Sequence, residues 1–394
     1  MPDAPILVIN TGSSSLKAGL YARVDGEETA VVEGLADNVG HQDSTATLRD
    51  AKGKILRREN LLLPSQGEAL RIFVRWFAEL KLPQPHAIGH RVVHGGPHLV
   101  VHQRITDDLL QTLRASVHFA PLHIPSALAL IEDTQRTYPR LPQFACFDTA
   151  FHRTMPEVAA RFALPQALFE EGVRRYGFHG LSYESIVHQL GGALPGRTVI
   201  AHLGSGASVA AIKDGRSVDT SMGLTPTGGI VMATRSGDLD PGVLLYLMRT
   251  QTRTADMLEN LLNRESGLQG ISGGTADMRE IEVRAKAGDR NAEMAIRIFC
   301  RSIAKTIASY AAVLDGIDLL VFTGGIGEHS AQVRREVCIA LQFMGLALAE
   351  PANESHAKTI STIDSPVQVM VLPSQEDEQI ARHCHELMSS GILP

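Results

Sequence analysis

The chain opens with Ile6-Leu-Val-Ile-Asn10-Thr-Gly12-Ser13-Ser14-Ser15-Leu16-Lys17-Ala-Gly-Leu20. A run of apolar, mostly β-branched residues ends in a Gly/Ser turn, and apolar residues resume directly after it, which predicts a β-hairpin. Leu16, Ala18 and Leu20 recur at every second position and are expected on one face of the second strand. The turn carries short polar side chains, Lys17 and open backbone N–H groups. This combination suits an anion such as phosphate, although an ordinary polar hairpin turn would have the same composition.

The composition is that of a globular protein large enough for more than one domain. The chain has 394 residues, of which 44% are hydrophobic and 20% charged, so two or three domains with substantial cores are expected. A net charge of −6 disfavours nucleic acid or an anionic membrane as the main partner. The four cysteines lie far apart, which is typical of reduced thiols. No apolar segment reaches the ~18–20 residues that span a bilayer, and no secretory signal is seen, so we expect a soluble, cytoplasmic protein.

A second strand, Gly/Ser turn and strand occupy Thr198–Ile212, with His202-Leu-Gly204-Ser205-Gly206 at the turn. This repeated layout predicts duplicated halves, with a ligand bound between them at the ends of facing strands. A Gly turn also follows the apolar run Asp318–Phe322, at Gly324-Gly-Ile-Gly327, where a helix is expected to begin. Such geometry can hold a nucleotide. A lone Gly turn after a strand is more often structural, however, and neither a Walker A sequence nor a clean G-x-G-x-x-G occurs.

The remaining elements follow from apolar periodicity and from helix start and stop signals. An antiparallel meander is expected over residues 21–64. The expected helices are Gln66–Lys81, Thr106–Val117, Pro125–Thr137, Glu293–Leu314 and one after Asp377, and the expected strands are Ala87–Val93, Pro142–Phe147, Asp318–Phe322 and Val367–Leu372.

Charged residues stand after strands and in glycine-rich loops. Arg91 interrupts an apolar strand, where a charge is costly unless it meets an anion, and Arg235 lies in a polar loop. Each fits a clamp on a phosphoryl group or a structural ion pair. Asp148 and Glu376 follow strands, as metal-binding carboxylates often do, although helix capping explains them equally well. His179 lies near glycines, where the backbone can approach a ligand or simply turn, and together these groups favour phosphoryl transfer with Mg²⁺.

These residues belong to longer stretches through which the chain resembles the acetate kinase family, that is, the acetate, propionate and butyrate kinases of the actin-like, sugar-kinase-like and Hsp70-like ATPase superfamily. The likeness covers essentially the whole length. It rests on Asn10–Lys17 (NTGSSSLK), His90–Gly96 (HRVVHGG), Ala120–Pro125, Phe147–His152 (FDTAFH), Tyr176–Ser182 (YGFHGLS), His202–Ser208, Thr234–Pro241 (TRSGDLDP), Phe322–Glu328 (FTGGIGE) and Pro373–Glu376.

The resemblance implies an α/β fold of two duplicated actin-like, ribonuclease H-like domains, with mixed sheets flanked by helices and the active site in the interdomain cleft. Residues 1–148 and 378–394 would form the N-terminal domain, on the acyl and phosphate side, completed by the C-terminal helix. Residues 149–377 would form the C-terminal domain, which would bind the nucleotide and join two copies into a homodimer.

The resemblance also implies roles for single residues around the reacting phosphoryl group. The catalytic residues would be Arg91, Asp148, His179, Arg235 and His123. Arg91 and Arg235 would flank the phosphoryl group and hold the acyl carboxylate, and His179 would hydrogen-bond an equatorial oxygen with His123 nearby. Mg²⁺, or Mn²⁺ in its place, would be served by Asn10, Asp148 and Glu376. The acyl methyl group would lie among Val93, Leu122 and Pro226.

The nucleotide and its phosphates would be bound by four segments. Ser13, Ser15 and Lys17 would belong to the first phosphate loop. The second phosphate loop would comprise His202, Leu203, Gly204, Ser205 and Gly206. Asp277, Met278 and Arg279 would line the adenosine side, and Gly325, Ile326, Gly327 and His329 would line the adenine and ribose pocket.

The implied reaction is a reversible, direct in-line transfer of the ATP γ-phosphate to acetate, which gives acetyl phosphate and ADP and supplies acetyl-CoA biosynthesis. An acetate carboxylate is already ionised at neutral pH, so no general base is required. The enzyme must instead bring two anions together, which explains the arginines and the metal.

The chain departs from the family pattern at six positions. Ser205 and His329 each stand where the family usually has Asn, Gly324 replaces Ala, Ile124 replaces Asn, Tyr183 replaces His and Gly228 replaces Glu. The alternatives are a propionate or other short-chain acyl kinase, a kinase with another phosphoryl donor such as pyrophosphate, and a non-catalytic ligand sensor on the same fold.

Overall fold

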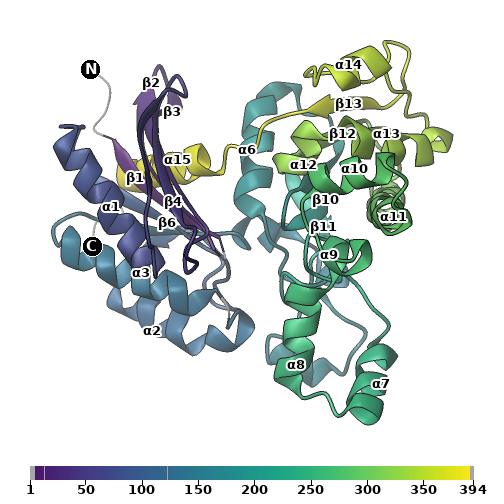
Figure 1. Cartoon of the computed structure of the whole chain (residues 1–394), viewed down its shortest axis with the longest axis horizontal. Helices are drawn as coiled ribbons and strands as arrows, with labels where there is room; N and C mark the ends of the chain where they lie inside the picture. The colour runs from purple at the N-terminus through teal and green to yellow at the C-terminus, as the bar shows by residue number, and fades with distance from the viewer. Residues whose placement is uncertain (1–4, 13, 122, 391–394) are drawn as a thin grey trace. The chain divides into compact units, whose positions relative to one another are not determined.

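A computed structural model describes residues 5–12, 14–121 and 123–390 of the chain. These residues form two compact units of mixed α/β structure (Figure 1). The first unit comprises Met1–Ala150, Gly180–Ser185 and Gln375–Pro394, and the second comprises Phe151–His179 and Ile186–Ser374. The expected α/β fold with two mixed sheets is confirmed.

The first unit is built on an eight-stranded sheet in the order β5-β4-β3-β2-β1-β6-β8-β7. Its strands are β1 (Ile6–Thr11), β2 (Leu16–Val24), β3 (Glu27–Asp37), β4 (Thr45–Asp50), β5 (Ile55–Asn60), β6 (Ala87–Val92), β7 (Gln103–Arg104) and β8 (Gln143–Phe147). The expected hairpin is β1 with β2, where Asn10 lies opposite Lys17, and β2 to β5 form the expected antiparallel meander. The strands β1, β6 and β8 run parallel to one another. Their carboxyl ends therefore share one edge of the sheet, where ligands bind in open α/β sheets.

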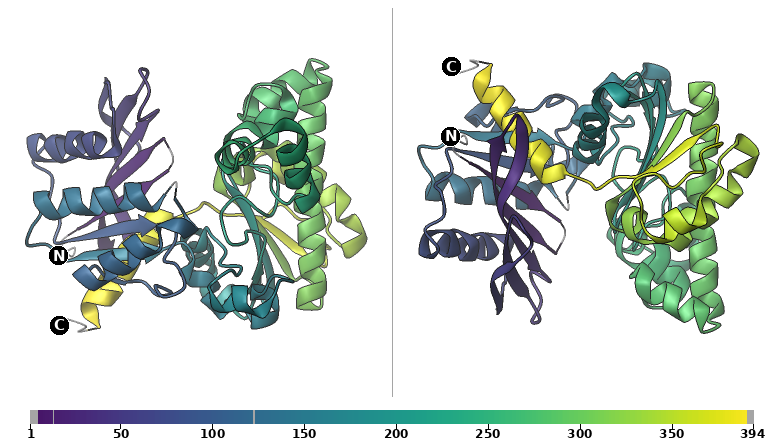
Figure 2. Two further views of the ribbon diagram at one scale, coloured as in Figure 1. Left: turned by 90° about the horizontal axis from the view of Figure 1, so that it is seen from below. Right: turned by 90° about the horizontal axis from the view of Figure 1, so that it is seen from above.

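The sheet of the first unit has helices on both of its faces (Figures 1 and 2), and alternating residues of β1 pack against the two layers. Leu7 and Ile9 belong to a core with α1 (Gln66–Glu79) and α3 (Ile124–Thr137), as do Leu16, Ala18 and Leu20 of the expected apolar face of β2. Ile6 and Val8 pack with α15 (Glu376–Ser389) on the opposite face. The helix α1 ends two residues before the expected Lys81 because Lys81 adopts a left-handed backbone, with φ 53°. The helix α2 (Asp107–Ala115) completes the layer beside α3.

The second unit repeats the plan of the first with a five-stranded sheet in the order β11-β10-β9-β12-β13. Its strands are β9 (Arg197–Leu203), β10 (Ala207–Lys213), β11 (Arg216–Thr220), β12 (Leu319–Thr323) and β13 (Gln368–Val371). The hairpin β9–β10 is followed by the parallel strands β12 and β13, as β1–β2 is followed by β6 and β8. This matching order confirms the duplication predicted from the two Gly/Ser turns.

Helices surround the second sheet, and the long helix α11 (Arg290–Leu314) covers one side of it (Figure 2). Asp289 caps its start by accepting from the N–H groups of Asn291 and Ala292, and Asp315 ends it with φ 58°. The other helices are α4 (Glu157–Ala160), α5 (Gln166–Glu170), α6 (Gly180–Leu190), α7 (Pro241–Gln251), α8 (Ala255–Asn260), α9 (Gly267–Ser272), α10 (Met278–Lys286), α12 (Gly324–His329), α13 (Ala331–Ala340) and α14 (Glu350–Glu354). The first residues of α6 belong to the first unit and its residues from Ile186 to the second.

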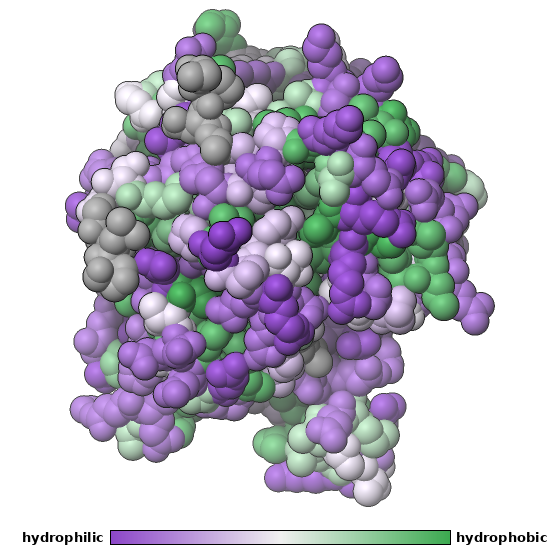
Figure 3. Space-filling model, turned by 90° about the vertical axis from the view of Figure 1, so that its left-hand side faces the viewer, coloured by the Kyte–Doolittle hydropathy of each residue, from purple (hydrophilic) through white to green (hydrophobic). Residues whose placement is uncertain are grey.

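The surface is predominantly polar on the face that Figure 3 shows, where hydrophobic residues form small areas among hydrophilic ones. Cys146, Cys300, Cys338 and Cys384 are buried and form no disulfide. Within the described part of the chain, no helix has the length and apolar character needed to cross a membrane.

Candidate active site

The first unit gathers Asn10, Arg91 and Asp148 at the edge where β1, β6 and β8 end. Asp148 is 1% exposed, and Arg91 holds it with two donors: Nη2 lies 2.6 Å from Oδ2, and Nε lies 2.9 Å from Oδ1. The remaining Arg91 nitrogen, Nη1, donates to Asn10 Oδ1 at 3.1 Å. Arg91 therefore makes the structural ion pair that was one of its two expected roles, and its guanidinium lies beside the other residues of this edge.

The charges at this edge act strongly on one another. Burial raises the pKa of the Asp148 carboxyl, and the Arg91 guanidinium opposes that rise. Burial would lower the pKa of Arg91, but the carboxylates of Asp148 and Glu376 raise it by more. The guanidinium is therefore the charge that makes a buried carboxylate tolerable here.

The start of α15 adds two more carboxylates to the same edge. Asn10 Nδ2 donates to Glu376 Oε2 at 3.3 Å and to Asp377 Oδ1 at 2.6 Å, and Lys17 Nζ lies 3.8 Å from Asp377 Oδ2. The Asp377 carboxylate raises the pKa of Lys17. Asp377 was not singled out from the sequence, although its position directly after Glu376 in the first turn of a helix was a usable signal.

This set of side chains fits a magnesium ion by its donor chemistry. Mg²⁺ prefers oxygen ligands and is commonly held by one or two carboxylates together with substrate phosphates. Asp148 and Glu376 offer such carboxylates, and each carboxylate perturbs the same guanidinium. Asn10, through its amide, connects the two strand ends to α15.

The second unit gathers His179, His202 and Arg235 around the turn of its own hairpin. The rings of His179 and His202 stack with centroids 4.3 Å apart, and His179 Nδ1 lies 2.8 Å from Ser208 Oγ. Arg235 Nη1 donates to the carbonyl oxygen of Pro226 at 3.1 Å. A Cβ on Gly206 would lie only 3.1 Å from His179 Nε2 and 3.3 Å from Arg235 Nη1, so the glycine is what lets both side chains approach the turn.

Residues expected to bind the nucleotide line one pocket of about 450 Å³ in the second unit. A pocket of this size is typical of sites for small molecules and cofactors. Its lining includes Gly204, Ser205, Asp277, Met278, Arg279, Gly325, Ile326 and His329, together with Ala233, Ala276, Glu282 and Ser330. Asp277 caps the start of α10 and pairs with Arg279 at 2.6 Å, which lowers the pKa of Asp277.

Four residues of the second unit that were expected at the nucleotide or its phosphates do not line this pocket: His202, Leu203, Gly206 and Gly327. Leu203 is fully buried, and a Cβ on Gly327 would lie 3.6 Å from Leu203 Cβ. Glu328, which the sequence analysis did not assign a role, accepts from the N–H groups of Gly324 at 3.0 Å and Ser374 at 3.1 Å. It thereby ties the segments that follow β12 and β13 to each other.

The other expected residues are divided between the two units. Val93 directly follows β6, His123 precedes α3, and the carbonyl of Ser15 accepts from Gly12 N–H in the first hairpin turn, all in the first unit. Pro226 lies in the second unit. Ser13 and Leu122 lie outside the described residues.

The chain matches known proteins over nearly its whole length. Residues 5–382 match the family model described as the acetokinase family. The chain is 43% identical to the acetate kinase of Methylocella silvestris over 97% of this chain and 98% of that protein, and 44% identical to the acetate kinase of Rhodopseudomonas palustris over 98% and 99%.

Solved structures show the same relationship. A propionate kinase from Francisella tularensis superposes with a TM-score of 0.90 at 37% identity and covers 96% of this chain and 98% of its own. An acetate kinase from Porphyromonas gingivalis superposes with a TM-score of 0.87 at 35% identity and covers 98% and 100%.

Proposed function

The chain belongs to the acetokinase family, and from that premise we propose that it is an acetate kinase. It transfers the γ-phosphate of ATP reversibly to the carboxylate of acetate and forms acetyl phosphate and ADP. The observation that carries the proposal is the edge of the first unit, where Arg91, Asp148 and Asn10 are joined by hydrogen bonds beside Glu376. Such an edge supplies both a cation for anionic substrates and oxygen ligands for a metal.

The residues of the chain divide the work of a direct transfer. Arg91 and Arg235 hold the acyl carboxylate and the phosphoryl group with directed N–H donors, and His179 donates to an equatorial oxygen with His123 nearby. Asp148 and Glu376, with Asn10 beside them, hold Mg²⁺, or Mn²⁺ in its place, which neutralises charge on the phosphate oxygens when bound. No residue need act as a base because acetate arrives ionised.

ATP and ADP bind to the second unit in this proposal. The pocket of about 450 Å³ takes the adenosine, and the turn that includes Ser205 and Gly206 takes the phosphates, as the corresponding first turn with Ser13, Ser15 and Lys17 does in the other half. We assign the first unit to the acyl and phosphate side and the second unit to the nucleotide side. The proposed location is the cytoplasm.

A trapping assay tests this function directly. Acetyl phosphate is converted to a hydroxamate, and the assay is run with acetate, propionate and butyrate and with ATP and pyrophosphate as donors. We expect acetate and ATP to give the highest kcat/KM. Activity that survives Arg91→Ala and Arg235→Ala together would contradict the assignment.

A propionate kinase is the second candidate, because the solved structure from Francisella tularensis carries that name. In this proposal, the side chains expected around the acyl methyl group, Val93, Leu122 and Pro226, decide between the two. One or two methylenes discriminate by only about 10–200-fold, so the ratio of kcat/KM for acetate to that for propionate settles the choice.

We also propose a homodimer joined through the second unit. Several large apolar side chains of α7 are 40–62% exposed: Val243, Leu245, Tyr246 and Met248. An apolar helix face of this kind is typical of protein interfaces. We expect the wild type to sediment as a dimer and Leu245→Asp as a monomer, whereas the control Leu62→Asp, at an exposed leucine of the first unit, stays dimeric. A dimeric Leu245→Asp variant would contradict this interface.

A further inference from the structure

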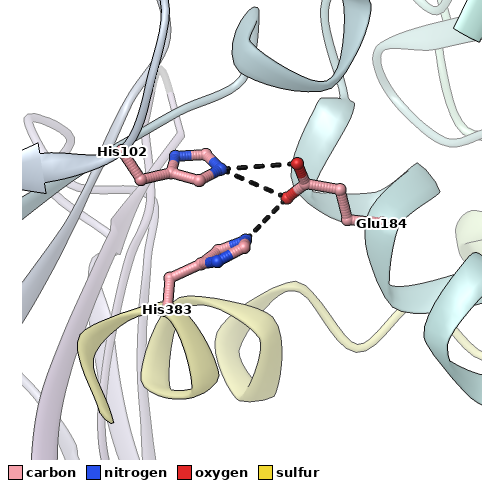
Figure 4. A group of neighbouring side chains, drawn as sticks. All are labelled: His102, Glu184 and His383. Carbon is pink, nitrogen blue, oxygen red and sulfur yellow. Dashed lines mark hydrogen bonds and ion pairs between the residues drawn. The ribbon is translucent and has the colours of Figure 1, made fainter. Parts of the chain in front are cut away.

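The first unit contains a largely buried cluster of His102, Glu184 and His383, whose side chains point toward one another (Figure 4). His102 directly precedes β7, Glu184 lies in α6 and His383 lies in α15. His102 Nε2 lies 3.3 Å from Glu184 Oε2, and His383 Nε2 lies 2.8 Å from the same oxygen. The three side chains are only 10–15% exposed. The three residues come from distant parts of the chain, so no spacing in the sequence predicts the cluster.

Two histidines and a carboxylate can hold a transition metal, but a backbone contact of His102 opposes this function. The N–H of Phe147 donates to His102 Nδ1 at 3.0 Å. Because Nδ1 accepts, the proton of the neutral ring must be on Nε2, which therefore donates to Glu184. A metal at Nε2 would need the opposite tautomer, in which the second nitrogen donates to a neighbour.

The charges of the other two residues suit an ion pair. Burial would lower the pKa of His383, but hydrogen bonds to Glu184 and Glu386 raise it to about 10. Burial would raise the pKa of Glu184, but hydrogen bonds from His102 and His383 lower it to about 2. Near pH 7 the cluster is a carboxylate that receives one neutral histidine and one imidazolium.

His102 supplies an acceptor that the sheet lacks at the end of β8. The short strand β7 pairs with β8 at Ala145 and Phe144. Among the described residues, no strand lies beside the N–H of Phe147 on that side, and His102 Nδ1 accepts from it instead. On the other side, the next N–H, that of Asp148, donates to Val92 O in β6 at 3.0 Å. The two successive peptide groups that lead into Asp148 are thus held from opposite sides of β8.

The helix α6 completes a closed loop of hydrogen bonds around the Asp148 segment. Its first residue, Gly180, donates its N–H to Asp148 O at 2.8 Å, and Glu184 lies one turn further along the same helix. Hydrogen bonds therefore run from Asp148 to Gly180, along α6 to Glu184, and back through His102 to Phe147. A shift of Glu184 moves both contacts of the Asp148 segment.

Glu184 also connects this closed loop to α15 through His383. The first turn of α15 carries Glu376, and His383 lies seven residues later, two turns along on the same side of the helix. Glu184 therefore contacts both segments that carry the candidate metal carboxylates: the Asp148 segment through His102, and the helix of Glu376 through His383.

We propose that Glu184, together with His102 and His383, is a positioning residue that fixes the Asp148 and Glu376 carboxylates at the spacing required for a divalent cation. This inference rests on the proposed function, since it takes those carboxylates as the metal site. The cluster itself binds no metal.

The test compares metal binding, kinetics and folding in full-length variants. Glu184→Gln keeps the volume and removes the charge, and Glu132→Gln is the matched control, because Glu132 makes an exposed ion pair with Arg114 in the same unit. Binding of Mn²⁺ alone is measured by the electron paramagnetic resonance signal of the free ion. Mutations in the shell that supports metal ligands typically cost 10–100-fold. We therefore expect Glu184→Gln to weaken Mn²⁺ binding and lower kcat by about 10-fold or more, with KM for acetate within about twofold of the wild type.

Two variants of His102 separate its two hydrogen bonds and remain informative if Glu184→Gln fails to fold. His102→Asn can keep the acceptor for Phe147 N–H, and His102→Gln can keep the donor to Glu184. We expect His102→Asn to bind Mn²⁺ more tightly than His102→Gln, because it preserves the contact nearest Asp148.

Three results would overturn the proposal. One is wild-type Mn²⁺ affinity and kcat in a folded Glu184→Gln protein. Another is equal loss in the Glu132→Gln control. The third is stoichiometric Co²⁺ or Zn²⁺ binding that His383→Gln abolishes, which would make the cluster a metal site. If the wild type forms no acetyl phosphate, the proposed function fails, while the Mn²⁺ measurements still report on the positioning of the carboxylates.

Discussion

Replacing Arg91 with alanine removes the counter-charge of a carboxylate that is 1% exposed. The wild-type guanidinium reaches Asp148 through Nη2 at 2.6 Å and Nε at 2.9 Å, so Arg91→Ala leaves Asp148 buried without its ion-pair partner. Breaking a buried ion pair by removing one partner costs about 3–5 kcal/mol. We expect a loss of unfolding free energy of that size near pH 7. The loss becomes smaller at lower pH, because protonation of Asp148 removes the uncompensated charge.

The single tryptophan of the chain makes this loss measurable. Trp76 is fully buried in α1, in the core of the first unit, so its fluorescence during urea unfolding reports on the unit that contains Arg91. The double variant Arg91→Ala/Asp148→Asn also removes the carboxylate that Arg91 neutralises, and it should recover much of the stability.

Activity should not recover with stability. Removing a donor that stabilises transition-state charge costs about 10²–10³ in kcat, and the double variant also loses a carboxylate of the proposed metal site. We therefore expect acetyl phosphate formation to fall at least that far in both variants. A double variant that regains activity would show that Arg91 acts only as a structural partner of Asp148. An Arg91→Ala protein as stable as the wild type would refute the ion-pair argument.

Three further perturbations follow from the geometry. Gly206→Ala places a methyl group 3.1 Å from His179 Nε2 and 3.3 Å from Arg235 Nη1. We expect kcat to drop about 10-fold or more and the free energy of unfolding to fall by about 1–3 kcal/mol, as in other overpacked sites. An unchanged kcat would contradict the inference that His179 and Arg235 need the space beside Gly206. Ile326→Trp fills part of the pocket of about 450 Å³, so KM for ATP should rise in steady-state kinetics while KM for acetate stays constant, and a rise in both would refute the pocket assignment. The pKa of His383 is raised from 6.5 to about 10, so its stabilising effect is complete below pH 6.5 and is lost as the pH rises toward 10. Unfolding followed by Trp76 fluorescence at pH 7 and 9.5 should show that the stability of His383→Gln depends less on pH than that of the wild type. An equal pH dependence of the two stabilities would argue against the ion pair with Glu184.

The local elements of the fold could be predicted from the sequence because their signals are local. The alternation after the first Gly/Ser turn placed Leu16, Ala18 and Leu20 in one core, and repetition of that turn at Gly204–Gly206 predicted a duplicated plan. Helix ends were less well predicted. Lys81 shows why, since its left-handed φ of 53° depends on how the following segment leaves the helix.

Residues of the candidate site could be predicted only where they belong to a recognisable sequence motif. Asp377 and Glu184 bond to segments that are hundreds of residues away in the chain, and no periodicity reports such contacts. Leu203 and Gly327 belong to matching motifs, but they are not among the residues that line the pocket. A sequence motif predicts roughly where a site lies, and side-chain packing decides which residues of the motif line it.

The two units use the same hairpin plan for different electrostatic tasks. In the first unit, three carboxylates and an asparagine meet Arg91 and Lys17, so strong charges of both signs are held close together. In the second, the turn lies among histidines, a serine and Arg235, with a glycine that gives them room. Opposite charges at short range require rigid support, since a small displacement changes their energy steeply. The first unit therefore needs the hydrogen bonds of Glu184 to His102 and His383. The second unit obtains its geometry because Gly206 has no side chain to block His179 and Arg235.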